Sequence, residues 1–190
     1  MARGLILAAR HPRPRIAARI CYGRTDVPLA EPAATGAAAL MAAAGEPIER
    51  IVSSPLSRAL LVAQAIAART GATLHTDDRL AEMDFGSWEG QAWAGLPRAE
   101  IDAWAAAPLL YRPGGGESVD AMLRRVRRAW TGIASSADTT LLVTHAGPIR
   151  CLLHVAGGMP LLEAIRAGVA YGSVTRFGGA TATAGPVWGG

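Results

Sequence analysis

The chain has 190 residues, of which 51% are hydrophobic and 18% are charged, and its formal net charge is +4. These values are typical of one globular domain over residues 1–190 with a sizeable core, and they argue against a disordered chain or two separate domains. The first apolar run is too short for a signal peptide and no stretch reaches transmembrane length. We therefore expect a cytoplasmic protein without a membrane partner.

The basic residues do not predict nucleic-acid binding. The densest group falls at helical spacing around apolar neighbours, which is typical of a solvated helix face rather than a nucleic-acid patch. This group consists of Arg124, Arg125, Arg127 and Arg128. Arginines spread along the chain could instead serve a small anionic substrate. Cys21 and Cys151 lack metal-ligand spacing, so we expect free thiols.

The first part of the chain alternates short apolar runs with helical patterns. The predicted elements are a strand at 5–10, a helix at 34–45, a strand at 48–54, a helix at 54–71 and a strand at 72–76. In the second helix, Ser54 is expected as the N-cap, Pro55 as the first residue and Gly71 as the residue just past the end.

The rest of the chain continues the alternation after a segment, residues 85–116, that is rich in Trp, Gly and Pro. The predicted elements are a short helix at 97–107, a helix capped by Ser118 and ending near Ile133, a strand at 139–145, a helix from Pro148 and a strand at 172–177. A Gly/Ala/Thr-rich tail follows. This alternation predicts an α/β fold, a three-layer sandwich whose mainly parallel sheet is flanked by helices on both faces.

Three of the strands lead into similar junctions. The first strand ends at Arg10 and His11. The second runs into a helix start that carries Arg58, and a later strand ends at His145 before another helix. Helix N-termini and arginines both bind phosphate oxygens, and a neutral histidine can attack phosphorus. Although each junction alone could be structural, together they predict a site for phosphoryl chemistry.

The same junctions resemble motifs of the histidine phosphatase superfamily, also called phosphoglycerate mutase-like. In chain order the matching stretches are ARH, CYGRTDVPL, SSPLSRA, EMDFGSWEG with GGGES, and VTHAGPIR. The roles that the resemblance implies are nucleophile for His11, proton donor for Glu82, and phosphoryl binding for Arg10, Arg58 and His145. It also implies that catalysis needs no metal and no cofactor.

The mechanism implied by this resemblance has two steps. Neutral His11 attacks phosphorus while the arginines and a protonated His145 stabilise the phosphoryl oxygens, and Glu82 protonates the leaving oxygen. Glu82 then activates the water that cleaves the phosphohistidine. One position departs from the family, which usually has Gly after the nucleophile, because Pro12 lacks an N–H group and has a fixed φ. We expect Pro12 to alter the geometry of the pocket without preventing catalysis.

The choice of the acid depends on the resemblance. From the residues alone, any of Glu82, Asp84 and Glu89 could be a surface carboxylate. The family pattern selects Glu82, whereas Asp84 and Glu89 are expected to hold the loop. Trp88 and Trp93, in the same segment, are expected to pack rather than to stack on a substrate.

The substrate is less closely defined. The Arg- and Pro-rich stretch that leads into CYGRTD resembles the α-ribazole phosphatase branch of cobalamin synthesis, and Tyr22, Gly23 and Arg24 match the substrate-lining stretch of the family. The short segment between Gly90 and Gly114 favours transfer to water over the mutase reaction.

Several alternatives stay open. The chain could act on another small phosphate ester or as a phosphoglycerate mutase, and an inactive phosphate-binding scaffold is disfavoured because the catalytic residue types are present. Arg13 could contact a second anionic group or simply lie in solvent. The expected partner is a small-molecule phosphate ester, with no nucleic acid and no membrane, and a homodimer is left open.

Overall fold

Five strands form one sheet in the order β3-β2-β4-β1-β5 in the computed structural model, which describes residues 4–178. The strands are β1 Ile6–Arg10, β2 Arg50–Ser53, β3 Thr73–Thr76, β4 Thr140–Thr144 and β5 Val174–Phe177. Strands β1 to β4 pair in parallel, and β5 adds an antiparallel edge beside β1. The Gly/Ala/Thr-rich tail lies outside the described residues.

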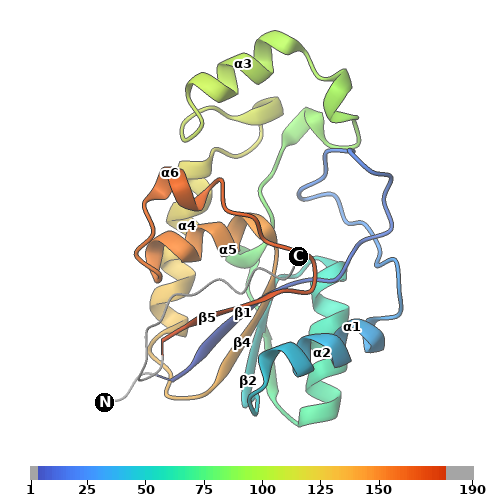
Figure 1. Ribbon diagram of the computed structural model, residues 1–190, viewed down its shortest axis with the longest axis vertical. Helices are drawn as coiled ribbons and strands as arrows, with labels where there is room; N and C mark the ends of the chain where they lie inside the picture. Colours follow the sequence, from blue (N-terminus) through green and yellow to red (C-terminus); the bar gives the residue numbers. More distant parts are fainter. Residues whose placement is uncertain (1–3, 179–190) are drawn as a thin grey trace.

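Helices cover both faces of this sheet, which confirms the predicted three-layer α/β architecture (Figure 1). The helices are α1 Ala33–Ala44, α2 Ser57–Thr70, α3 Arg98–Ala106, α4 Val119–Ile133, α5 Ala146–Val155 and α6 Leu161–Ala164. The 3₁₀ turns are η1 Asp78–Leu80, η2 Gly86–Trp88, η3 Trp93–Gly95 and η4 Pro113–Gly115. Helices α1 and α2 pack on one face and α4 and α5 on the other, whereas α3 stands away from the sheet.

The side chains of β1 explain why its sequence is an uninterrupted apolar run. Ile6 and Ala8 belong to the core cluster under α4 and α5, and Leu7 and Ala9 belong to the cluster under α1 and α2. Successive strand residues point to opposite faces of a sheet, so a strand covered on both faces needs apolar residues at every position.

A separate aromatic cluster holds the segment between β3 and α4. Trp88 is 1% exposed and packs edge-on against Trp93 and Trp104, and its indole N–H donates to Glu100. Cys21 is buried in the same cluster. The predicted packing role of Trp88 and Trp93 is therefore confirmed.

Two helix starts differ from the prediction. Helix α2 begins at Ser57 with Leu56 as its N-cap residue, because the chain bends at Pro55 and Leu56 before the helix starts. Helix α5 begins at Ala146, two residues before Pro148. Proline is tolerated there because the first-turn N–H groups of a helix have no partner within the helix. Ser118 does cap α4, since its hydroxyl accepts a hydrogen bond from the Ala121 N–H.

The basic group on α4 is only partly solvated. Arg124, Arg127 and Arg128 are exposed as predicted, but Arg125 is 7% exposed, so the prediction is wrong at this position. Both cysteines are buried free thiols. Within residues 4–178, no helix has the length and apolar character needed to cross a membrane.

Candidate active site

The pairing of β1 with β4 brings the two predicted histidines together. Arg10 lies opposite Thr144 in the strand register, so the next residues, His11 and His145, lie side by side. The His11 N–H donates to the Thr144 carbonyl at 3.0 Å, and the two imidazole centroids are 5.0 Å apart. Both rings are almost fully buried, at 1% and 0% exposure.

Arg58 enters this site from the first turn of α2. Its side chain is fully buried and donates hydrogen bonds of 2.9 and 2.6 Å to the carbonyls of Thr25 and Gly23. The guanidinium lies 5.3 Å from the centre of the Tyr22 ring. A Cβ atom on Gly23 would lie 1.9 Å from the Met83 carbonyl oxygen, so only glycine fits there. Two of the predicted substrate-lining residues, Tyr22 and Gly23, therefore contact a predicted phosphate ligand.

Arg10 has an aromatic neighbour that the sequence did not single out. Its guanidinium stacks 3.6 Å above the centre of the Tyr171 ring and donates to the Val169 carbonyl. The Tyr171 hydroxyl shares a 2.5 Å hydrogen bond with the Tyr22 hydroxyl, and its ring centre is 5.7 Å from that of His11. Tyr171 thus lines the site from the turn before β5.

His11 is held as a neutral nucleophile. Its Nδ1 lies 2.6 Å from the Pro12 carbonyl oxygen, which can only accept, so Nδ1 carries the proton and Nε2 keeps its lone pair. The pKa of His11 is lowered to about 3, mainly by burial; the hydrogen bond to Pro12 opposes this shift, and the charges of Arg58 and Arg10 add to it. The imidazole is therefore uncharged at neutral pH.

Pro12 is accommodated by the neighbouring helix. Its ring packs against Gly36 of α1, where a Cβ atom would lie 2.4 Å from the Pro12 Cγ. The Pro12 carbonyl still accepts from His11, so the departure from the family pattern leaves the tautomer of the nucleophile fixed.

His145 has one partner and one unpaired nitrogen. Its Nε2 lies 2.7 Å from the Ser54 hydroxyl, and its Nδ1 is buried without a hydrogen-bond partner. Burial, and with it the positive charges of Arg58 and Arg10, hold the pKa of His145 well below its usual value. The free protein therefore carries a neutral His145, and the protonated form expected from the sequence requires a negative phosphoryl group beside it. Ser54, which the sequence predicts as a helix cap, serves this histidine instead.

Glu82 reaches the same helix N-terminus as His145. Its carboxylate accepts the Gly147 N–H, 3.1 Å from Oε1 and 3.3 Å from Oε2, and also the Met83 N–H at 2.9 Å. Gly147 lies in the first turn of α5, two residues after His145. The predicted acid therefore lies at the edge of the histidine site.

The other two acids of this loop bind backbone. Asp84 accepts the Gly86 N–H at 2.7 Å, and Glu89 accepts the N–H groups of Arg24 and Phe85 at 2.9 and 3.0 Å. Although burial raises the pKa of Glu89, hydrogen bonds from Thr25 and backbone N–H groups hold it below the usual value. These contacts fit the loop-holding role expected for both acids.

The site leaves several buried side-chain nitrogens without hydrogen-bond partners. Among the described residues, four buried side-chain nitrogens lack a hydrogen bond: Arg10 Nε, Arg58 Nε, His145 Nδ1 and Trp104 Nε1. Three of the four belong to the predicted phosphate ligands. Buried polar groups are normally satisfied, so this cluster indicates an anion-binding site. In residues 4–178, no group of three or more His, Cys, Asp or Glu side chains could hold a metal ion.

Gly147→Ala should displace the Glu82 carboxylate and lower kcat for an alkyl phosphate by about 10–100-fold, because small misplacements of a catalytic group have effects of this size. The new Cβ atom would lie 2.2 Å from Glu82 Oε1, which is the end of a flexible side chain, so the fold should survive. The measurement is steady-state hydrolysis alongside urea unfolding.

The matched control for this variant is Gly132→Ala on α4, where a Cβ atom meets nothing within 4 Å. Its activity should equal that of the wild type. Unchanged activity in Gly147→Ala would show that the position of Glu82 does not limit the reaction.

Comparisons with known proteins identify the family of the chain. The model of the histidine phosphatase superfamily (branch 1) matches residues 6–183. Bifunctional protein Rv2228c of Mycobacterium tuberculosis is 38% identical over 155 residues, which are 75% of this chain and 41% of that protein. The chain thus spans less than half the length of this curated relative.

Solved structures show the same fold. A native mycobacterial glucosyl-3-phosphoglycerate phosphatase aligns with a TM-score of 0.74 at 26% identity, covering 92% of this chain and 89% of its own. The α-ribazole phosphatase of Shigella flexneri aligns with a TM-score of 0.78 at 24% identity, covering 90% and 89%, which is a likeness of fold alone.

Proposed function

The chain belongs to the histidine phosphatase superfamily, and we propose that it hydrolyses a phosphate monoester through a phosphohistidine on His11. The observation that carries this proposal is the buried, neutral His11 ring among unpartnered nitrogens of Arg10, Arg58 and His145. A neutral nucleophile beside the unpaired Nε–H groups of two arginines suits attack on a phosphate dianion.

In the first step, the lone pair of His11 Nε2 forms a bond to phosphorus while the bond from phosphorus to the leaving oxygen breaks. Arg10, Arg58 and His145 hold the non-bridging oxygens, and the proton of Glu82 goes to the leaving oxygen. The alcohol then departs and Glu82 is left ionised.

In the second step, Glu82 accepts a proton from water as that water attacks the phosphohistidine. The N–P bond breaks, its electron pair returns to His11 Nε2, and inorganic phosphate leaves. The cycle restores both groups and consumes one water.

Two esters are candidate substrates. The stretch leading into Tyr22 supports α-ribazole 5′-phosphate, the substrate class of the branch that the sequence resembles. Glucosyl-3-phosphoglycerate is the second, because a structurally similar mycobacterial protein is named as the phosphatase of that ester. A hollow of about 470 Å³ contains three arginines, Arg24, Arg112 and Arg124, beside the carboxylates of Asp84 and Glu117.

The test measures phosphate release from α-ribazole 5′-phosphate, glucosyl-3-phosphoglycerate, 3-phosphoglycerate and p-nitrophenyl phosphate, with mutase turnover assayed on the same preparation. We expect phosphate release that survives exhaustive treatment with EDTA, and no mutase turnover. Activity lost with EDTA and restored by a divalent ion would contradict the metal-free mechanism. Binding of esters without any turnover would identify a scaffold.

A further inference from the structure

Arg125 is the one arginine of the α4 basic group that turns inward. Its Nε and Nη2 bind the two carboxylate oxygens of Glu117 at 2.7 and 2.8 Å, and the side chains of this pair are only 9% and 14% exposed. Such a two-pronged contact fixes the plane and direction of the guanidinium.

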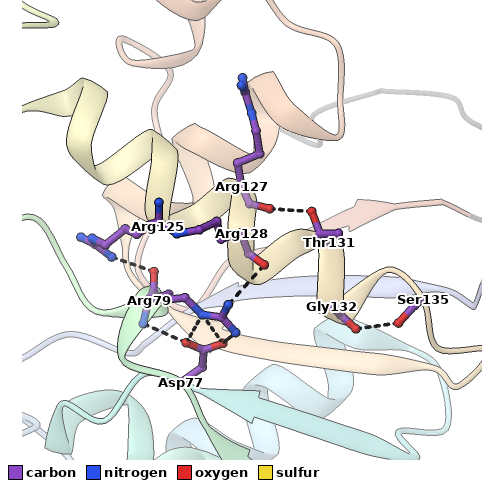
Figure 2. A network of polar contacts seen from close by, with 8 residues as sticks. All are labelled: Asp77, Arg79, Arg125, Arg127, Arg128, Thr131, Gly132 and Ser135. Carbon is purple, nitrogen blue, oxygen red and sulfur yellow. Dashed lines mark hydrogen bonds and ion pairs between the residues drawn. The ribbon is translucent and has the colours of Figure 1, made fainter.

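The remaining donors of Arg125 bind the backbone just before the proposed acid. Nη1 donates to the carbonyls of Arg79 and Ala81, both at 2.7 Å, and Nη2 donates to the Glu82 carbonyl at 3.2 Å. Figure 2 shows the Arg125 guanidinium directed at the Arg79 carbonyl. One side chain therefore holds three carbonyls of the turn that ends at Glu82.

Glu117 holds the other side of the same turn. Its N–H donates to the Asp84 carbonyl at 2.7 Å. The Arg125 side chain thus holds the backbone up to Glu82, and the backbone of its partner Glu117 holds it after Glu82. The carboxylate of Glu82 reaches the Gly147 N–H at the start of α5.

Other contacts anchor only the beginning of this turn. Arg79 pairs with Asp77 and donates to the Arg128 carbonyl at 3.3 Å (Figure 2), and the Thr144 hydroxyl donates to the Leu80 carbonyl at 2.6 Å. Of the side chains in the described residues, only that of Arg125 donates to the carbonyls of Ala81 and Glu82.

Replacing a buried ion pair by apolar residues is often neutral or stabilising, so stability alone does not account for this pair. A role in holding the proposed catalytic carboxyl of Glu82 would account for the pair. We propose that Arg125, oriented by Glu117, is a positioning residue that fixes Glu82 at the distance from which it protonates the leaving oxygen. This inference rests on the proposed function.

The test compares Arg125→Lys and Glu117→Gln with a control variant, Arg127→Lys. The control makes the same change on the same helix, but at an exposed residue whose side chain points away from Arg79 and Asp77 (Figure 2). Lysine keeps the charge of Arg125 but cannot span a carboxylate and three carbonyls. We expect kcat for an alkyl phosphate to fall about 10–100-fold in Arg125→Lys and about 10-fold in Glu117→Gln.

Phosphorylation by p-nitrophenyl phosphate should change by less than about 3-fold in both variants, because a phenolate leaves without a proton. Arg127→Lys should match the wild type on both esters. Equal losses on both esters in Arg125→Lys would contradict a role through Glu82 and indicate general damage to the site.

A double-mutant cycle decides whether Arg125 acts through Glu82. In the Glu82→Gln background, Arg125→Lys should cause no further loss on the alkyl ester, because the group that it positions is already absent. If Arg125→Lys lowers the rate on the alkyl ester by the same factor in the wild type and in Glu82→Gln, the inference is wrong. If Arg125→Lys does not fold, judged by circular dichroism, the cycle is made with Glu117→Gln. A wild type without phosphatase activity would refute the proposed function, whereas an active wild type with independent losses refutes this inference alone.

Discussion

Replacing His11 by alanine should lower kcat for phosphate esters by about 10⁴-fold or more, the scale of losing a covalent nucleophile. We expect no other histidine to substitute, because Ser54 holds the ring of the neighbouring His145 at Nε2, whereas the Nε2 of His11 keeps its lone pair. The measurement is turnover together with mass spectrometry of protein quenched in alkali, since phosphohistidine is labile in acid. His75→Ala, at an exposed position of β3, is the control and should retain full activity. Full activity in His11→Ala would refute the mechanism.

The same variant reports the charge state of His11 through stability. The pKa of His11 in the folded protein, about 3, lies below the value of 6.5 for an unperturbed histidine. Between these values the unfolded chain binds the extra proton, so the wild type loses stability as the pH falls through this window, by up to about 1.4 kcal/mol per pH unit. His11→Ala lacks this loss. Chemical unfolding from pH 7 to pH 4 should therefore show the variant gaining stability relative to the wild type, and parallel curves would contradict a buried neutral imidazole.

Glu82→Gln should slow hydrolysis of an alkyl phosphate by about 10²–10⁴-fold, the usual range for general acid catalysis. Glutamine keeps the shape of Glu82 and an oxygen for the Gly147 N–H, so the loss reports the missing proton. Phosphorylation of His11 by p-nitrophenyl phosphate should suffer much less, because its leaving group is stable as an anion. Burst kinetics with the aryl ester and steady-state rates with the alkyl ester separate the two effects.

The control for this prediction is Asp84→Asn, because Asp84 accepts the Gly86 N–H within its own loop. It should not show the dependence on the leaving group. If it does, and Glu82→Gln does not, the acid is assigned to the wrong residue.

The layers of the fold and the place of the histidines followed from the sequence because they depend on local signals. Apolar strands followed by helices predict a parallel sheet, and the carboxyl ends of its strands share one edge, where His11 and His145 lie. Glu82 is different, since three acids of one loop have the same local pattern, and only the family resemblance distinguished it from Asp84 and Glu89.

The residues that the sequence missed depend on contacts between distant segments. Helical spacing cannot show that Arg125 turns inward, because its partner Glu117 lies before the helix and its carbonyl acceptors lie in another loop. Tyr171 reaches Arg10 from a turn without a sequence signal of its own. Ser54 has the propensity of a helix cap, but the buried His145 ring competes for its hydroxyl and the helix starts later.

The register of β1 against β4 has a consequence for how the protein folds. Ile6 pairs with Thr140, so the nucleophile's strand closes a loop that contains most of the described chain. Contacts of such high sequence separation form late, because the entropy of loop closure must be overcome before they stabilise the chain. During synthesis the apolar β1 leaves the ribosome long before β4 and must stay unaggregated until its partner arrives. Chains interrupted before β4 should therefore have no residual catalysis, so activity in cells reports completed folding rather than the amount of polypeptide made.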